Sequence, residues 1–360
     1  MPKIHNLLVQ NLKQTKLNFN IRDIIMKLTR LLVGAALAGT LAMPALAQDP
    51  TFFRIGTGGA GGTYFPIGGT IANGISSPPG SRACDDGGQC GVPGLIAIAQ
   101  STTASVFNNA AVQNGQLEAG LAAADVTRSM YFGEGKFEGK PHPKLRVIAN
   151  LYPEDLHLVL PKGETINDLG DLAGKRVGIA QAGSGTQVGV LEMLAEWGVT
   201  RDNMEEAELN NSQSAERLAD GQIDAYFYAA GWPVAAMVQL SSTKGMNLHS
   251  FSEADLLKIN ELIPAYIPSK IPAGVYEGID TETLTPAVSA FLNVSSDLSE
   301  DLVYQLTKAL WNDNTRKMLD NGHAKGKQIT PETALDGVIA LGVPLHPGAE
   351  KFYKEAGLLD

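Results

Sequence analysis

The hydrophobic positions of this chain alternate between short β-rich runs and longer stretches with helical spacing, which favours an α/β architecture. The Pro-rich stretch Ile263–Gly274 fits neither period and is predicted to be a rigid extended connector. The predicted strands are Phe52–Ile55, Leu95–Ala99, Ala119–Ala123, Arg146–Asn150, Leu156–Leu160, Arg176–Ala180, Ala225–Tyr228 and Met246–His249. The predicted helices are Phe65–Ile75, Ala104–Asn114, Gly185–Trp197, Ser212–Asp220, Trp232–Ser241, Ser252–Leu262 and Ser299–Asn312.

The N-terminal residues follow the pattern of an export signal. Residues 26–47 open with basic side chains, continue with the apolar run Leu31–Leu41 and end in Ala45-Leu46-Ala47. This order predicts a secretory signal peptide cleaved after Ala47, and therefore a periplasmic protein. The run is too short for a membrane anchor, and no cysteine follows the cleavage point to carry a lipid. Met26 is predicted to be the initiator, and residues 1–25 a non-native extension.

The charge of the remaining chain limits its partners. Residues 1–47 hold six of the 28 basic residues and one of the 38 acidic ones. The rest carries 22 Lys and Arg against 37 Asp and Glu, a net charge of −15. This balance argues against nucleic acid and anionic membrane surfaces as partners. Residues 48–360 are enough for two domains of ordinary size.

The two cysteines are separated by only five residues, in Cys84-Asp-Asp-Gly-Gly-Gln-Cys90. In an oxidising compartment this spacing predicts a disulfide that closes a small surface loop. The alternative is a metal site that adds Asp85 and Asp86 as ligands. Mixed thiolate and carboxylate sites are uncommon and no histidine lies nearby, so a disulfide is favoured and no metal is expected.

A glycine loop joins the first predicted strand to the first predicted helix. Five of the seven residues from Gly56 to Gly62 are glycine. Loops of this kind direct backbone N–H groups, and the positive end of the following helix, toward one point. The sequence therefore predicts an anion site that uses the hydroxyl of Thr57 and the backbone N–H groups of Gly58 and Gly59.

A second unit of the same kind follows the strand Arg176–Ala180, in Gly183-Ser184-Gly185-Thr186. A third hydroxyl cluster, Ser101-Thr102-Thr103, follows the strand Leu95–Ala99. All three loops would lie at the carboxyl ends of strands, where open α/β sheets bind ligands. If the chain forms two lobes, these donors converge from both sides of a cleft.

Dinucleotide binding is one alternative, because residues 56–61 match G-x-G-x-x-G after a strand. That fold also needs an acidic residue about twenty positions later, at the end of a second strand. Residues 76–80 are Ser-Ser-Pro-Pro-Gly, a turn-rich stretch without a strand pattern. Exported proteins rarely meet NAD, so no cofactor is expected.

A hydrolase is the second alternative, because Ser184 lies between two glycines. The nucleophile motif G-x-S-x-G is not met, since Ala182 and Thr186 occupy the positions that need glycine. The histidines are scattered without triad or metal spacing. No catalytic residue is therefore expected.

Several other side chains allow either a ligand contact or a structural role. Tyr64 directly follows the glycine loop, where it would hydrogen-bond a ligand or pack at the helix start. Asp125 and Arg128 follow a strand, where both would reach a cleft. Alternatively, Asp125 serves as a helix cap and Arg128 as a surface charge. The aromatic residues Tyr226–Tyr228 and Trp232 would wall a ligand pocket or belong to the core.

The chain resembles the TAXI type of solute-binding protein, the extracytoplasmic receptor of TRAP transporters. The likeness runs in order through the whole chain after the signal peptide. Two segments depart from the pattern: the Cys84–Cys90 loop is an addition, and Ser101–Asn109 differs from the usual Gly-Ser-Val-Glu-Asn-like run. The matching segments are 55–69, Leu151-Tyr-Pro-Glu154, 171–177, 183–186, 220–225, 271–276 and Pro344-Leu-His-Pro-Gly-Ala-Glu350.

The resemblance implies a type II periplasmic-binding-protein fold, with residues 48–155 plus 285–360 in lobe 1 and 156–284 in lobe 2. The implied receptor needs no cofactor. It binds a small organic acid or amino acid, such as glutamate, a 2-oxoacid or a dicarboxylate, and delivers it to a TRAP permease driven by an ion gradient. An exported ligand sensor and an exported enzyme are the alternatives. The expected binding residues are Thr57, Gly58, Gly59, Tyr64, Ser101, Thr102, Ser184, Gly185 and Thr186, with Phe227 and Trp232 as walls.

Overall fold

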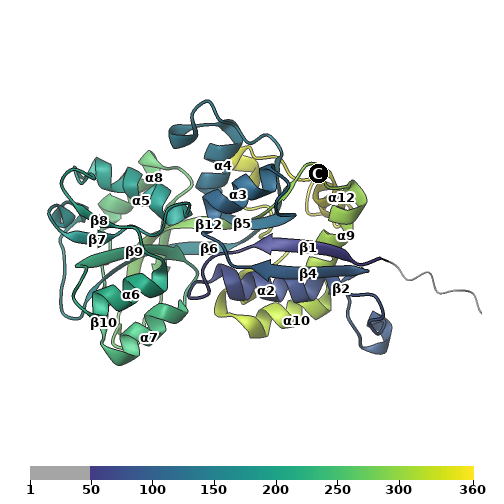
Figure 1. Ribbon diagram of the computed structural model, residues 1–360, viewed down its shortest axis with the longest axis horizontal. Helices are drawn as coiled ribbons and strands as arrows, with labels where there is room; N and C mark the ends of the chain where they lie inside the picture. The colour runs from purple at the N-terminus through teal and green to yellow at the C-terminus, as the bar shows by residue number, and fades with distance from the viewer. Residues whose placement is uncertain (1–48) are drawn as a thin grey trace, which may run out of the picture. The chain divides into compact units, whose positions relative to one another are not determined.

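The computed structural model describes residues 49–360, so the predicted extension and signal peptide lie outside the described residues. One large sheet runs through the described chain, in the order β4-β1-β5-β12-β6-β9-β7-β8 (Figure 1). Two further strands join it, β10 beside β6 and β11 beside β12. Helices cover both faces of the sheet, which confirms the predicted type II α/β fold with two lobes.

Lobe 1 is built on three parallel strands in which β1 lies between β4 and β5. Helices α2 and α10 pack against each other on one side of these strands, and α3 and α4 lie on the other side (Figure 1). The strands are β1 (Thr51–Gly56), β4 (Leu95–Gln100) and β5 (Ala119–Ala123). The helices are α2 (Tyr64–Ile75), α3 (Ser105–Gln113), α4 (Ala124–Phe132), α9 (Glu300–Leu310), α10 (Asp313–Gly322), α11 (Val338–Leu341) and α12 (Pro347–Glu355).

Lobe 2 repeats the same principle, because β7 pairs in parallel with both β8 and β9. Its helices follow the strands in the chain, so each strand ends in a loop that leads into a helix. The strands are β7 (Arg176–Gly178), β8 (Glu205–Ala207), β9 (Ala225–Ala230) and β10 (Met246–Leu248). The helices are α5 (Gly185–Glu196), α6 (Asn211–Ala219), α7 (Ala235–Thr243) and α8 (Glu253–Leu262).

Two long antiparallel strands, β6 (Leu145–Pro161) and β12 (Thr283–Ser295), connect the lobes. The last part of β6 turns to pair with β9 and β10, so one strand belongs to both lobes. The predicted lobe boundaries, 155/156 and 284/285, fall inside these two strands. The apolar side chains of β6 contribute to a hydrophobic core shared by both lobes.

Most predicted elements are confirmed within two residues at each end, but the crossing strands differ from prediction. Residues 146–150 and 156–160 belong to the single strand β6, because the intervening residues, which the prediction left outside both strands, continue it. Strand β12 and the helices α4, α10, α11 and α12 have no counterpart in the prediction. Helix α7 begins at Ala235, three residues later than predicted, after Pro233.

The prediction for the Pro-rich stretch is wrong over Ile267–Ile271, which form strand β11. This strand pairs with β12 in antiparallel register, with Pro268 opposite Pro286. Among the described strands β11 pairs only with β12, so it is an edge strand, where the missing N–H of a proline is tolerated.

The disulfide loop lies on lobe 1, between the short strands β2 (Ser76–Ser77) and β3 (Val92–Pro93). Cys84 and Cys90 are joined by a disulfide, so both thiolates of the alternative metal site are taken. The amide of Asn312 donates to the carbonyl of Cys90 and fastens the loop to the helical layer. Between residues 49 and 360 no helix has the length and apolar character to cross a membrane.

Candidate functional site

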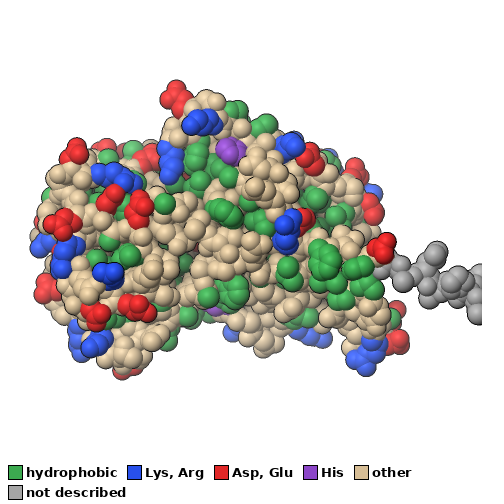
Figure 2. All heavy atoms as spheres, viewed as in Figure 1, with side chains coloured by type: hydrophobic (Ala, Val, Ile, Leu, Met, Phe, Trp, Pro, Cys, Tyr) green, Lys and Arg blue, Asp and Glu red, His purple; other side chains and the backbone are tan. Residues whose placement is uncertain are grey.

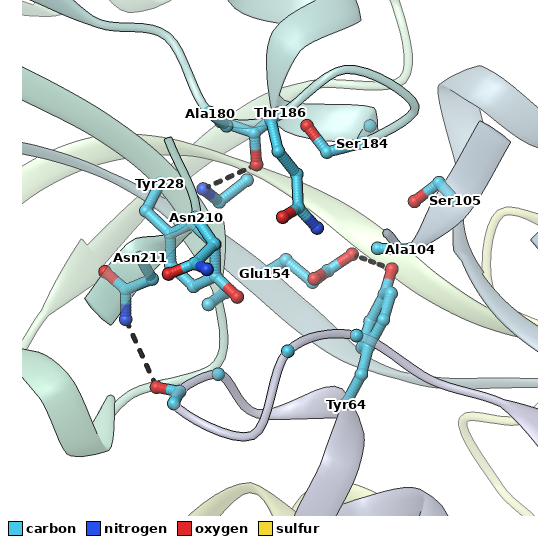
Figure 3. Close-up of a pocket in the computed structure, with 18 of the residues that line it drawn as sticks. Tyr64, Ala104, Ser105, Glu154, Ala180, Ser184, Thr186, Asn210, Asn211 and Tyr228 are labelled. Carbon is cyan, nitrogen blue, oxygen red and sulfur yellow. Dashed lines mark hydrogen bonds between the residues drawn. The ribbon is translucent and has the colours of Figure 1, made fainter. Parts of the chain in front are cut away.

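A cavity of about 340 Å³ lies where the carboxyl ends of the strands of both lobes meet. Lobe 1 contributes the glycine loop Gly58–Gly62, and lobe 2 contributes the loop that leads into α5. Figure 3 shows Tyr64 and Ser105 of lobe 1 and Ser184 and Asn210 of lobe 2 around one space. The lining residues are Gly58–Gly62, Tyr64, Ser101, Ala104, Ser105, Ala123, Glu154, Ala180, Gln181, Ser184–Thr186, Asn210–Ser212, Tyr228–Ala230 and Tyr266.

The helices α2, α3, α4, α5 and α6 all begin at this cavity. In each case the first helical residue or its cap lines the space: Tyr64, Ser105, Ala123, Gly185 and Asn211. The convergence follows from the topology, because each of these helices follows the carboxyl end of a strand. The positive ends of five helix dipoles therefore point toward the cavity.

Unpaired backbone donors reach the cavity from both lobes. Within residues 49–360, no acceptor is bound by the N–H groups of Gly58 and Gly59 in lobe 1, or of Gly185 and Thr186 in lobe 2. The hydroxyl of Ser184 accepts a hydrogen bond from the N–H of Gln187, so its own proton is available. Free N–H groups at a helix start are chemically suited to hydrogen-bond an anion.

Glu154, on β6, is the one charged side chain among the lining residues of the described chain. It is 3% exposed, and the hydroxyl of Tyr64 donates to its Oε2 over 2.6 Å (Figure 3). Burial raises the pKa of Glu154 to about 8, against the opposing effect of the Tyr64 hydrogen bond. Sequence reasoning missed this residue as a site residue, although an acid within the apolar run of residues 145–160 was the signal that could have found it.

The cations of the neighbourhood are not directed at the cavity. Asp155, the next residue of β6, pairs with Lys325 over 2.8 Å, and both side chains are buried. The ammonium group of Lys325 also lies 4.5 Å from the ring centre of Trp232. Adjacent residues of a strand point to opposite faces, so Glu154 faces the cavity while Asp155 faces the ion pair.

Comparison with known families identifies the chain. A model of the NMT1-like family matches residues 55–357, nearly all of the described chain. The chain belongs to the NMT1-like family. The match to the family model therefore extends over both lobes and over every element that lines the cavity.

Several solved structures are similar to this NMT1-like protein at low identity. One is a protein of Bordetella bronchiseptica RB50, 18% identical, with a TM-score of 0.48, covering 84% of this chain and 82% of that one. Another is the alkanesulfonate-binding protein SsuA of Xanthomonas axonopodis pv. citri bound to MOPS. It is 15% identical, with a TM-score of 0.43, and the match covers 87% of this chain and 95% of that one. Identities and TM-scores this low say nothing about the ligand of the NMT1-like chain.

Seven of the residues expected from sequence line the cavity of the NMT1-like protein: Gly58, Gly59, Tyr64, Ser101, Ser184, Gly185 and Thr186. Their four hydroxyls all have partners, and those of Tyr64 and Ser184 are described above. Ser101 donates to the carbonyl of Gly58, and Thr186 accepts from the N–H of Ala229. The Ser101 proton is therefore already used, whereas that of Thr186 is not.

The structure does not place Thr57, Thr102, Phe227 or Trp232 in the cavity lining. Thr57 is fully buried beneath α2, where its hydroxyl donates to the carbonyl of Gln100. The hydroxyl of Thr102 donates to the Thr57 carbonyl and so fastens the loop.

The aromatic positions differ from expectation because of strand alternation. Phe227 points into the hydrophobic core, and its neighbour Tyr228 lines the cavity in its place. Trp232 lies under Lys325, away from the lining. The aromatic wall therefore consists of Tyr64, Tyr228 and Tyr266.

The lobes touch around the cavity. The carbonyl of Gly183 accepts from the N–H groups of Val106 and Phe107 at the start of α3, over 3.1 and 3.3 Å. The amide of Asn211 donates to the Gly61 carbonyl from the other lobe. The NMT1-like protein is therefore in a closed arrangement, and the start of α3 is occupied by the opposite lobe.

Proposed function

We propose that this protein is a periplasmic receptor that binds a small carboxylate between its two lobes. The ligand class is an amino acid such as glutamate, or a 2-oxoacid or dicarboxylate. We propose further that the receptor delivers its ligand to a TRAP-type permease, as the resemblance to TAXI receptors implies. No catalytic step and no cofactor belong to this proposal.

The observation that supports the proposal most is the set of free N–H groups at Gly58, Gly59, Gly185 and Thr186. They belong to residues of both lobes that line one cavity. Hydrogen bonds to a charged group contribute about 1.5–3 kcal/mol each. Four such bonds contribute about 6–12 kcal/mol, a range that includes the roughly 8 kcal/mol of a dissociation constant of about 1 μM. A ligand held from both sides also selects the closed state.

The lining argues against an exported enzyme. Within residues 49–360 neither histidine nor cysteine lines the cavity, so this part of the chain places no imidazole beside the Ser184 hydroxyl to act as a base. The surface argues against nucleic acid. Basic and acidic side chains are interspersed on the face shown in Figure 2, with no basic stripe on that face. An exported sensor remains the second candidate, because a sensor binds its ligand without turnover.

A thermal-shift screen of residues 48–360 tests the proposal. The screen compares amino acids, 2-oxoacids and dicarboxylates with sugars and metal cations at matched concentrations. At least one carboxylate compound is expected to raise the melting temperature. If only a sugar or a cation does so, the anion-site argument fails. Incubation followed by product analysis separates a receptor, which returns the ligand unchanged, from an enzyme.

A further inference from the structure

The charge inside the cavity is the opposite of what a plain carboxylate site needs. Its one charged side chain among the described residues is acidic, and Lys325 is committed to Asp155 on the other face of β6. A ligand that carries only carboxylates therefore brings negative charge beside Glu154 with no side-chain cation to offset it. Burying like charges together is unfavourable unless one of them takes a proton.

The geometry leaves part of Glu154 for a ligand. Tyr64 occupies Oε2, and the described chain supplies no hydrogen bond to Oε1. Glu154 projects into the space between the two loops, as Figure 3 shows. Gly58 and Gly185, whose N–H groups bind no acceptor within residues 49–360, also line this space. The cavity thus offers an acceptor for a cation and separate donors for an anion.

We propose that Glu154 is the specificity-determining residue of the cavity, and that it selects ligands with a positively charged amino group beside their carboxylate. This inference rests on the proposed receptor function and narrows it. Amino acids bind, because their ammonium pairs with Glu154 while their carboxylate takes the backbone donors. The 2-oxoacids and dicarboxylates of the same length bind less tightly, because they offer no cation to pair with Glu154, which then stays protonated.

The pairing of Glu154 with the ammonium group of a ligand releases the proton of Glu154 on binding. Burial raises the pKa of Glu154 to about 8, so near pH 7 the empty site is mostly protonated. An ammonium group favours the ionised form and drives the proton off. The titratable and charged groups that act on Glu154 or lie against it are Tyr64 on α2, Asp125 on α4, Tyr152 and Asp155 on β6, Tyr228 on β9, Tyr266, and Lys325.

Matched ligand pairs test the inference on the wild-type protein. L-glutamate is compared with 2-oxoglutarate and glutarate, and L-alanine and L-leucine with their 2-oxoacids. Each pair differs only in the amino group. The amino acid of at least one pair is expected to bind at least 10-fold more tightly than its 2-oxoacid. Calorimetry at pH 7 in two buffers of different ionisation enthalpy is expected to show release of up to one proton.

The variant Glu154→Gln keeps the shape of the side chain and removes its charge. It is expected to lose at least 10-fold in amino-acid affinity and to abolish the proton release. The matched control is Glu192→Gln, on the exposed face of α5 and outside the cavity lining, which is expected to leave both unchanged. The proton count on the wild type keeps the test decisive if Glu154→Gln folds poorly.

The two proposals fail differently. Equal or tighter binding of the 2-oxoacids, proton uptake, or unchanged amino-acid affinity in Glu154→Gln overturns the role of Glu154 and leaves a carboxylate receptor standing. If no amino acid, 2-oxoacid or dicarboxylate binds the wild type at all, the receptor proposal falls and the selectivity falls with it.

Discussion

Two consecutive acids on β6 meet opposite environments, and the difference decides what each does. Asp155 accepts from Ser269 and pairs with Lys325, so its buried charge is satisfied. Within the described chain, the carboxyl group of Glu154 accepts a hydrogen bond only from the hydroxyl of Tyr64, and it forms no direct ion pair. A buried acid without a cation costs stability once it ionises. We infer that this cost is retained because Glu154 serves the cavity rather than the fold.

The cost predicts a pH-dependent stability. The folded pKa of Glu154 is about 8, above its ordinary value of 4.5, so the folded state binds more protons than the unfolded one between these values. The contribution of Glu154 to the unfolding free energy is therefore fully present below about pH 4.5. It is lost as the pH rises from there through about 8, by up to about 1.4 kcal/mol per pH unit. Asp125, with a pKa raised by burial to about 7, acts in the same direction.

The measurement is urea unfolding of the wild type and Glu154→Gln between pH 7 and 8.5. His157 acts in the opposite direction, because burial lowers its pKa to about 4, but only below its ordinary value of 6.5. In the chosen window the wild type is expected to lose stability with rising pH, and Glu154→Gln to lose less. Equal slopes in the two proteins would show that Glu154 ionises freely in the folded state.

At the scale of elements, the start of α5 both caps a helix and lines the cavity. The hydroxyl of Ser184 accepts from the N–H of Gln187, which leaves the preceding N–H groups of Gly185 and Thr186 free. Helix α9 uses the same device far from the cavity, where Ser299 accepts from the N–H of Leu302. A comparison of Ser184 with Ser299 therefore distinguishes the helix-stabilising role of the cap from a ligand-binding role.

The variants Ser184→Ala and Ser299→Ala test that separation. Each is expected to cost about 1 kcal/mol of unfolding free energy through the lost cap. Only Ser184→Ala is expected to reduce the thermal shift produced by the strongest ligand of the screen, because only its hydroxyl faces the cavity. Equal thermal shifts in both variants would mean that the Ser184 hydroxyl serves the helix alone.

At the scale of the whole described molecule, closure depends on small residues where the lobes touch. A Cβ at Gly185 would lie 2.7 Å from the hydroxyl of Ser105 and 3.3 Å from the Cβ of Ala123, both in the other lobe. We propose that the lobes open by bending at β6 and β12, the two strands that cross between them. Glycine at position 185 then allows them to close.

The variant Gly185→Ala is expected to hinder closure and to weaken ligand binding about 10-fold, since overpacking costs about 1–3 kcal/mol. Its fold is expected to survive, because alanine favours a helix more than glycine does. The control is Gly69→Ala in α2, where a Cβ meets no atom within 4 Å. Small-angle X-ray scattering with ligand present reports closure directly. A closed, tight-binding Gly185→Ala would refute the steric role of this glycine.

Local patterns in the sequence determined the strands and helices that alternate along each lobe, and with them the binding loops. A strand, a glycine loop and a helix start are neighbours in the chain, so Gly58, Gly59, Ser184 and Gly185 could be placed at strand ends from sequence alone. Their convergence on one cavity was predicted only on the condition that the chain forms two lobes, with strand ends facing each other across a cleft.

Tertiary structure decided what depends on partners distant in the chain. Strand β12 and the unbroken course of β6 exist because they pair with each other, and β11 is a strand because β12 lies beside it. The same pairing buries Glu154 and turns it toward the cavity, which no local pattern reports. Side-chain direction was also decided there: one residue of shift along β9 puts Tyr228 into the cavity and Phe227 into the core, because a strand alternates its faces.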